Sequence, residues 1–368
     1  MVGRNLNKKK KNYVLRFFFT LSIILGLFLG NPAVSKAEGN EIGTKQSDIK
    51  TSEKDTSNDV GFSIEPVLPS NQVDQSKGFY YLKVKPGDEQ EVILNVKSTK
   101  KEAAKLKIYI KDAYTNPNGF IDYDGKNYHR DKTLKQSVED ITSLSHKKIT
   151  VKNFESKEVK IKIKVPGKEF DGIKAAAVCV MSDNNIKESK KQGLSSSYGY
   201  RLGLIVTEED EEYEKGKSLK LLRVKPTIHS GKRVIQARFQ NPEPQILGDL
   251  TVKTKLRKKG NSEVLRSRTT NNMRMAPNSQ FDFATNWGLD PLRPGTYVLS
   301  IRANSNGKSW KWEKEFTIGN KEAKKINEEA SYTLTYPNWT PIVVVLLGII
   351  TLVLFGLLYM RRKKWNAQ

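Results

Sequence analysis

The sequence is poor in cysteine and histidine, and this scarcity excludes several kinds of stabilisation and chemistry. Its 368 residues include one cysteine, Cys179, so no disulfide can form within the chain. The three histidines, His129, His146 and His229, do not have the spacing of metal ligands. A Gly-x-Ser-x-Gly elbow and a phosphate-binding Walker loop are also missing. We therefore expect no enzyme activity, no metal site and no cofactor, and a buried, unreactive Cys179 in the apolar stretch 175–181.

Acidic residues are missing from residues 1–37, and this absence points to secretion. The segment begins with a cluster of lysines and arginines, continues with the apolar run 17–29, and ends in Ser35-Lys36-Ala37. These are the three parts of a secretory signal peptide, and we expect cleavage after Ala37. The alternative is an uncleaved signal anchor, but the apolar run is short for a membrane span. Residues 38–60 are polar and lack aromatic side chains, which predicts a disordered spacer.

Charge is also missing from residues 342–360, and four basic residues follow this segment directly. The segment is long enough to cross a hydrocarbon layer of ~30 Å as a helix. The basic tail 361–368 places the C-terminus in the cytoplasm and the bulk of the chain outside the cell. The alternative is a helix buried in the core of a domain, but neither the length of the apolar segment nor the basic residues directly after it fit that alternative. The wall-sorting sequence Leu-Pro-x-Thr-Gly is absent before the apolar run, so we expect a retained span in a Gram-positive cell membrane.

Positive charge dominates what is present. The chain has 64 lysines and arginines against 40 acidic residues, a formal net charge of +24, and it stays basic when the two ends are set aside. Outside the cell, nucleic acid is not an expected partner. Anionic wall polymers, anionic lipid headgroups and acidic proteins are the candidates, and a merely solvated basic surface is the alternative.

Short alternating strands fill residues 61–185. The clearest is 159–165, where Val159, Ile161, Ile163 and Val165 alternate with polar residues, which indicates one buried and one wet face. Pro-Gly pairs at 86–87 and 166–167 predict turns. About seven such strands predict an all-β, immunoglobulin-like sandwich. A long loop at 114–144 is a candidate binding region. Its Asp122 and Asp124 lack the further ligands of a calcium loop.

A second set of strands predicts a second immunoglobulin-like β-sandwich in tandem, over residues 195–319. The strand at 198–207 has two possible places, since it can pair with residues 173–181 of the first domain or open the second. Residues 320–341 are expected to form a juxtamembrane stalk, with a short helix at 321–330 as an option, before the span at 342–360.

Several motifs resemble those of the WxL-interacting proteins. In the first half they are residues 62–72, 78–87 and 115–119, and in the second half they are 239–242, 275–281, 294–297 and 310–312. The resemblance covers nearly the whole mature chain. It implies a peptidoglycan-binding domain, a second domain that binds host extracellular proteins, and association with WxL-domain surface proteins. One departure is Ala175-Ala176-Ala177, where the family tends to have a glycine pair; alanines still keep that strand slim.

The resemblance supplies no site motif that can be carried over residue by residue. Asn71, Gln72, Asn116 and Tyr123 are candidates for glycan contact, because polar and aromatic groups suit sugars. The alternative is that the first two hold a turn and that Tyr123 packs in its loop.

Three tryptophans, Trp287, Trp310 and Trp312, are candidates for a protein-binding patch. Since Trp310 and Trp312 share one face of a strand, the alternative places them in the core.

Three functions follow from these observations. The first is a membrane-anchored adaptor that binds peptidoglycan, a WxL-domain protein and host matrix. The second is a wall-glycan binder without a protein partner, and the third is a structural spacer.

Overall fold

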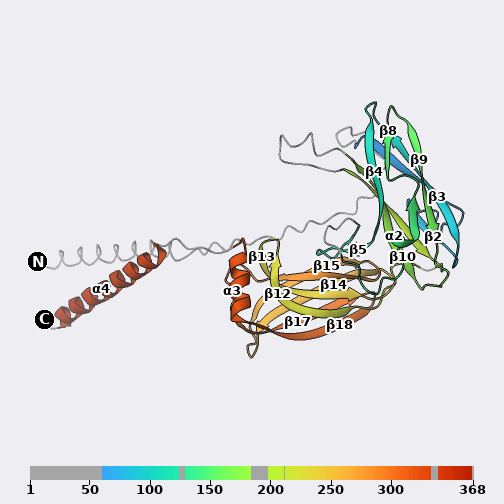
Figure 1. Ribbon diagram of the computed structural model, residues 1–368. Helices are drawn as coiled ribbons and strands as arrows, with labels where there is room; N and C mark the ends of the chain where they lie inside the picture. The colour runs from blue at the N-terminus through green and yellow to red at the C-terminus, as the bar shows by residue number, and fades with distance from the viewer. Residues whose placement is uncertain (1–59, 124–128, 184–197, 211, 333–338, 367–368) are drawn as a thin grey trace, which may run out of the picture. The chain divides into compact units, whose positions relative to one another are not determined.

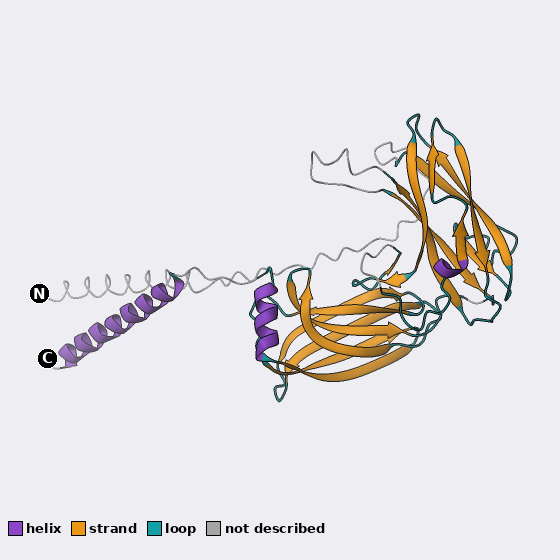
Figure 2. Ribbon diagram, in the orientation of Figure 1, coloured by secondary structure: helices purple, strands orange, loops and turns teal. Residues whose placement is uncertain are grey.

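A computed structural model of the chain describes residues 60–123, 129–183, 198–210, 212–332 and 339–366 (Figure 1). Strands make up most of the described chain up to residue 318, and helices follow them (Figure 2). The strands form two sandwiches in tandem, each with its own hydrophobic core, as the alternating sequence patterns predict. The expected signal peptide and nearly all of the expected spacer lie outside the described residues.

The first sandwich consists of two sheets, with strand orders β1-β3-β9-β7 and β2-β11-β10-β4-β8, and a small ribbon of β5 and β6. Its elements are β1 (Phe62–Val67), β2 (Tyr80–Lys83), β3 (Glu89–Ser98), β4 (Ala104–Asp112), β5 (Tyr114–Thr115), β6 (Ile121–Asp122), α2 (Val138–Ile141), β7 (Thr142–Leu144), β8 (Lys148–Val151), β9 (Ser156–Lys164), β10 (Ile173–Ser182) and β11 (Gly199–Thr207).

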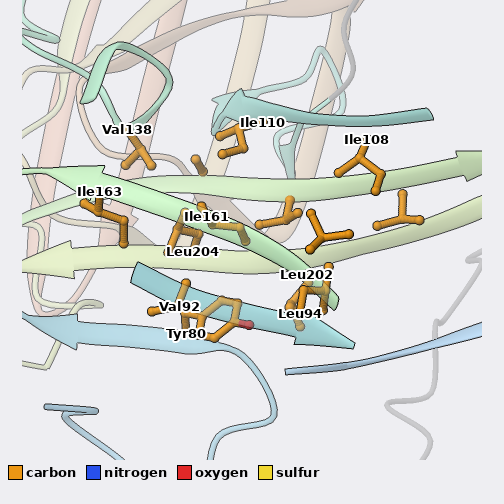
Figure 3. Close-up of a cluster of buried hydrophobic side chains, with 14 of the residues drawn as sticks. Tyr80, Val92, Leu94, Ile108, Ile110, Val138, Ile161, Ile163, Leu202 and Leu204 are labelled. Atoms are coloured by element: carbon orange, nitrogen blue, oxygen red, sulfur yellow. The ribbon is translucent and has the colours of Figure 1, made fainter. Parts of the chain in front are cut away.

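Strand β9 shows why this sequence forms a sandwich. Val159, Ile161 and Ile163 are fully buried, while the intervening lysines are exposed. The inner residues meet those of the facing sheet, including Ile108 and Leu204 (Figure 3). Burying each such side chain contributes roughly 1.5–3 kcal/mol relative to exposure. The period of two in the sequence is therefore set by a core that lies on one side of the strand.

Strand β11 belongs to the first sandwich. It pairs antiparallel with β10, with Ala176 opposite Leu204, and in parallel with the edge strand β2. Of the two arrangements that the sequence left open for residues 198–207, the structure has the pairing with residues 173–181. The first sandwich is thus completed by β11.

The second sandwich begins at β12 and has a three-stranded sheet, β12-β13-β16, facing a four-stranded sheet, β15-β14-β17-β18. The strands are β12 (Lys220–His229), β13 (Lys232–Asn241), β14 (Leu247–Lys258), β15 (Val264–Met275), β16 (Ser279–Asn286), β17 (Gly295–Ser305) and β18 (Lys308–Ile318). All of their ladders are antiparallel. Its core is rich in aromatic residues, and the Phe239 ring contacts those of both Phe281 and Phe283.

Helix α3 (Asn320–Glu329) closes the second sandwich. Its Ala323 and Ile326 are buried in the core of that sandwich. Asn327 accepts hydrogen bonds from Arg233 Nε and from the Leu292 amide, each at 2.7 Å, and its own amide donates to the Leu292 carbonyl at 2.9 Å. Of the two arrangements left open for residues 321–330, the structure has the helix, packed on the second sandwich, at the start of the expected stalk 320–341. Residues 333–338 lie outside the described residues.

Helix α4 (Thr340–Asn366) is the apolar helix that the sequence predicts near the C-terminus. Within residues Thr340–Lys363, the most apolar window of 18 residues has a mean hydropathy of 3.0, and it is not buried against the rest of the chain. By length and composition, this helix is able to cross a membrane.

The Asn327 contacts predict a measurable cost for their removal. We expect Asn327→Ala to lower the free energy of unfolding by about 1–3 kcal/mol, because the buried Arg233 and the Leu292 amide lose their acceptor. Denaturant unfolding of the full chain in neutral detergent measures this. Lys321→Ala, an exposed change on the same helix, is the control and should stay within about 0.5 kcal/mol of the wild type. Equal effects of the two changes would contradict the proposed role of Asn327.

Candidate functional site

Asn71 and Gln72 lie in the loop between β1 and β2, and their side chains hold that loop. The buried Gln72 accepts a hydrogen bond from the Tyr81 amide at 3.0 Å and donates to the Phe79 carbonyl at 2.8 Å. Asn71 donates to the Lys83 carbonyl at 2.7 Å. Both amides therefore bind main chain at the edge strand β2, and glycan contact by these two residues stays a prediction.

Asn116 and Tyr123 occupy the loop that follows β4. The Asn116 side-chain oxygen accepts hydrogen bonds from the amides of Asn118 and Phe120, at 3.0 and 3.1 Å, and so closes the turn. Tyr123 packs against Cys179 on the outer face of β10, and this burial raises the pKa of its hydroxyl. Asn116 and Tyr123 therefore lie in the loop that follows β4, whereas Asn71 and Gln72 lie in the loop between β1 and β2.

Strand β10 carries small residues on both faces, which lets the loop that follows β4 pack closely on its outer face. Ala176 points into the main core, whereas Ala175 and Ala177 point outward. Ala175 lies under a layer that includes Tyr213, and Ala177 lies in the cluster that includes Tyr123. Larger outward side chains would lift these tyrosines off the sheet, so the slim strand has a packing role.

The loop 113–141 contacts the second sandwich through hydrogen bonds. The buried Thr115 hydroxyl lies 2.6 Å from the Ser279 hydroxyl and accepts from the Ala276 amide at 3.0 Å. Further along, the buried Asp131 accepts from the Gln240 side-chain amide through both carboxylate oxygens, each at 2.9 Å. The loop that the sequence suggests for ligand binding thus makes specific contacts with strands and loops of the second domain.

Two glycines permit the close approach at these contacts. Gly119 has φ 82° and its carbonyl accepts a hydrogen bond from the Arg274 amide at 2.8 Å; a Cβ there would overlap the Met273 side chain. Gly172 has φ 65°, and a Cβ there would overlap the Pro244 carbonyl. A side chain at Gly119 would displace the Met273 side chain, and one at Gly172 would push the two backbones apart.

An ionic cluster holds the base of the same loop. Arg130 bridges Asp112, at 2.8 Å, and Asp140, at 2.7 Å. Burial raises the pKa of the Asp112 carboxyl, against the opposing effects of a hydrogen bond from the Glu139 amide and the charge of Arg130. Lys174 donates to the Lys135 carbonyl at 2.7 Å. These bonds tie the loop to β4 and β10.

The three tryptophans lie on the core side of the second sandwich. Trp287 is 7% exposed and meets Tyr297 edge to face, with ring centroids 5.3 Å apart. Trp312 packs on Phe239 at 5.8 Å, and Trp310 is half-buried against the same core. They are therefore spread over the core rather than gathered in an exposed patch, and protein binding by them stays a prediction.

A cavity of about 370 Å³ opens beside Trp287 and Tyr297, between the ends of β14 and β17. Arg266, in its wall, donates to the Trp287 carbonyl and is paired with Asp290 at 2.9 Å. The polar groups of this arginine are thus engaged within the protein.

Phe154 is a candidate that the sequence patterns did not reveal. It is 53% exposed, and both it and Asn153 have positive φ, 60° and 51°, in a turn closed by the Glu155 amide and the Lys152 carbonyl at 2.9 Å. A left-handed backbone is costly for an aromatic residue, and such strain is concentrated at functional sites. The sequence signal that could have revealed this turn is the pair Asn153-Phe154, at positions where such a turn favours Asn-Gly.

Comparison with protein families gives a match for each sandwich. A family model described as "WxL Interacting Protein, peptidoglycan binding domain" matches residues 62–182, and one described as "WxL Interacting Protein, host binding domain" matches residues 189–328. The second model starts before β11, although β11 is hydrogen-bonded into the first sandwich. No curated protein matches this chain.

Among solved structures, similar chains include the YadV chaperone, with 10% identity, coverage of 70% of this chain and 100% of that chain, and a TM-score of 0.29. The Pseudomonas aeruginosa CupB2 chaperone has 15% identity, coverage of 64% and 97%, and a TM-score of 0.27. The E. coli chaperone DraB has 13% identity, coverage of 70% and 98%, and a TM-score of 0.26. Likenesses this weak carry no argument about function.

The contacts of Thr115 predict how the loop and the second sandwich depend on each other. We expect Thr115→Val to cost about 1–3 kcal/mol in local stability, because the Ala276 amide and the Ser279 hydroxyl lose a buried partner. Faster hydrogen exchange at the amides of Ala276 and Arg274 would report this loss.

The control is Thr142→Val, which removes a hydroxyl that donates to the Val138 carbonyl at 2.7 Å. It should leave exchange at Ala276 and Arg274 unchanged. Unchanged exchange at both amides in Thr115→Val would show that the loop contact is not needed for that part of the second sandwich.

Proposed function

We propose that this chain, which belongs to the family of WxL-interacting proteins, is a membrane-anchored surface adaptor. Its first sandwich contacts peptidoglycan, and its second sandwich binds a protein partner outside the cell. The observation that carries the proposal is that two binding-domain models of one family together match both sandwiches. Binding rather than catalysis is the role that both descriptions name.

Helix α4 supports the anchoring part of the proposal. It is apolar, it is long enough to span a bilayer, and its last turns carry Arg361, Arg362 and Lys363. Positive charge favours the cytoplasmic side, so both sandwiches would lie outside the cell of a Gram-positive bacterium. The expected signal peptide at residues 1–37 agrees with this orientation.

The protein partner is proposed from the family alone. A WxL-domain surface protein is the first candidate, and a host extracellular protein is the second, as the description of the second domain model suggests. The loop 113–141 favours an adaptor over a loose spacer, because it couples the two sandwiches through Thr115 and Asp131. Load applied to one domain would thereby reach the other.

The experiment that tests the adaptor uses the full chain in neutral detergent. It is incubated with insoluble peptidoglycan and, separately, with beads that carry the WxL-domain protein encoded beside it, at low and high salt. Retention on both at high salt supports the proposal, because screened long-range attraction cannot account for it. Retention on peptidoglycan alone favours the wall-glycan binder. Retention on neither, or at low salt only, favours the spacer.

Phe154 is the residue that we propose for sugar contact, alongside the polar candidates Asn71 and Asn116. An exposed aromatic ring offers a flat apolar face, with little side-chain entropy to lose on binding. Its turn is also bonded to the neighbouring loop, since the Asn153 amide donates a hydrogen bond to the Lys101 carbonyl at 3.3 Å. The ring is therefore held on a defined turn and is not on a loose tip.

Replacing Phe154 separates function from stability. We expect Phe154→Gly to raise the free energy of unfolding by about 1 kcal/mol, because glycine adopts positive φ without the steric cost. The same change should weaken binding to peptidoglycan about fivefold, the equivalent of one lost ring contact. Denaturant unfolding and co-sedimentation measure the two effects.

Phe154→Ala is the matched variant. It removes the ring but keeps the strained backbone, so it should bind as weakly as Phe154→Gly without the gain in stability. Undiminished binding in both variants would exclude Phe154 from the glycan site.

A further inference from the structure

The outer face of the four-stranded sheet in the second sandwich carries a row of like charges. The register places Lys253 of β14 opposite Arg302 of β17, and Arg302 opposite Lys311 of β18. All three side chains are exposed, while their neighbours Val252, Thr254 and Ile301 are buried. Because side chains alternate along a strand, the three cations point outward from adjacent strands and form one row, which we call the cationic row.

Like charges directly opposite each other on neighbouring strands destabilise a sheet. The side chains of the cationic row stand about 5 Å apart at their Cβ atoms. Among the described residues, no carboxylate forms an ion pair with Lys253, Arg302 or Lys311. Lys255, which is also exposed, lies outside the row, two residues further along β14 and opposite Ser300. Repulsion within the row is therefore left uncompensated by the protein.

The carboxylates of β18 are engaged elsewhere. Glu313 pairs with Arg257 at 3.0 Å and accepts a hydrogen bond from Ser300 at 3.0 Å. Glu315 pairs with Lys259 at 2.8 Å. These contacts neutralise one end of the outer face and leave the row at the other end positive.

The first sandwich shows what a compensated lysine face looks like in the same chain. On β9, Lys160 pairs with Glu91 at 3.0 Å, and Lys162 and Lys164 both pair with Glu89, at 2.7 and 3.2 Å. Glu91 and Glu89 of the neighbouring strand β3 lie opposite Lys162 and Lys164, and Glu91 reaches Lys160 diagonally. The contrast makes the cationic row a distinct feature of the second sandwich and not a general result of the basic composition.

Polar, uncharged side chains border the row. Thr251 of β14, Asn304 of β17 and Ser309 of β18 form the next row along the sheet, and Thr269 of β15 lies opposite Lys253. Hydroxyl and amide groups can bond to the hydroxyl and ring oxygens of a sugar, while the planar guanidinium of Arg302 can take two oxygens of a sulfate group. The face thus combines closely spaced cations with hydrogen-bonding groups.

We propose that the cationic row is a docking site for a linear sulfated polysaccharide. Sulfate esters stay ionised and can be closely spaced along such a chain, which would complement three cations that repel one another. This inference deepens the proposed function, since it names a ligand class for the second sandwich and relies on that sandwich being outside the cell. Binding would release the repulsion within the row, so the ligand would also stabilise the sheet.

The test measures elution of the full chain, in neutral detergent, from immobilised heparin over a range of salt concentrations. The row variant is Lys253→Gln/Arg302→Gln/Lys311→Gln. The control variant is Lys160→Gln/Lys162→Gln/Lys164→Gln, which removes the same charge from the compensated face. We expect the wild type and the control to be retained alike. The row variant should bind about tenfold more weakly, with a salt dependence shallower by about three counterions.

Two further polymers separate the sources of the attraction. Heparin from which the sulfates have been removed should not retain the wild type, and poly(glycerol phosphate) should retain it more weakly than heparin. The proposal is overturned if the row variant elutes with the wild type, if both triple variants weaken equally, or if either comparison polymer retains the protein as well as heparin does.

Folding and the wider function are checked in the same samples. The row variant should melt at the same temperature as the wild type or higher, because repulsion has been removed. It should also sediment with peptidoglycan as the wild type does. Loss of peptidoglycan binding by the wild type would count against the adaptor and leave the heparin result standing. Loss of heparin binding alone would count against the row.

Discussion

Burial of strand β10 on both faces is the constraint on which the arrangement of the first half depends. Its inner residues complete the core between the two sheets, and its outer residues Ala177 and Cys179 are equally buried. A strand in this position needs a cover on its outer side. The loop that follows β4 supplies it with Tyr123, and the segment after β11 supplies it with Tyr213. The segments that cover β10 also contact the second sandwich. The same segments therefore pack against β10 and couple the two domains.

Charge is organised differently in the two sandwiches. The lysines on β9 face glutamates on β3, so this surface is close to neutral in spite of its composition. In the second sandwich, acidic partners gather at one end of the outer sheet face, and Arg302 lies among cations at the other. Net charge alone does not explain this difference, because the pairing of charges depends on which strands are neighbours. Electrostatic specificity in this protein is thus a product of register.

The strained turn at Phe154 and the cationic row share one property. In both, the chain keeps residues that a fold selected for stability alone would replace, glycine in the turn and a carboxylate in the row. Local costs of this kind mark binding surfaces in proteins, which are stabilised by the remaining structure. The two features lie in different sandwiches, which agrees with the proposal of an adaptor that has two kinds of ligand.

The sequence by itself determined the features that depend on local pattern. Alternation at Val159, Ile161 and Ile163 predicted a strand with one buried face, the uncharged run near the C-terminus predicted an apolar helix, and the motif order predicted the family; the structure and the family models confirm all three. Each of these properties can be recognised from residues that are close in the sequence, because strand period, helix length and turn chemistry depend on short stretches of chain.

Tertiary structure alone decided which residues meet across the chain. The sequence could offer Asn71, Gln72, Asn116 and Tyr123 as glycan candidates, but only the fold shows that their polar groups or rings are engaged in holding loops. It also places β11 in the first sandwich and packs α3 onto the second. Strand order and register bring distant residues such as Lys253 and Lys311 into one row. The physical reason is that pairing between strands is set by burial of the whole sheet, which no local pattern encodes.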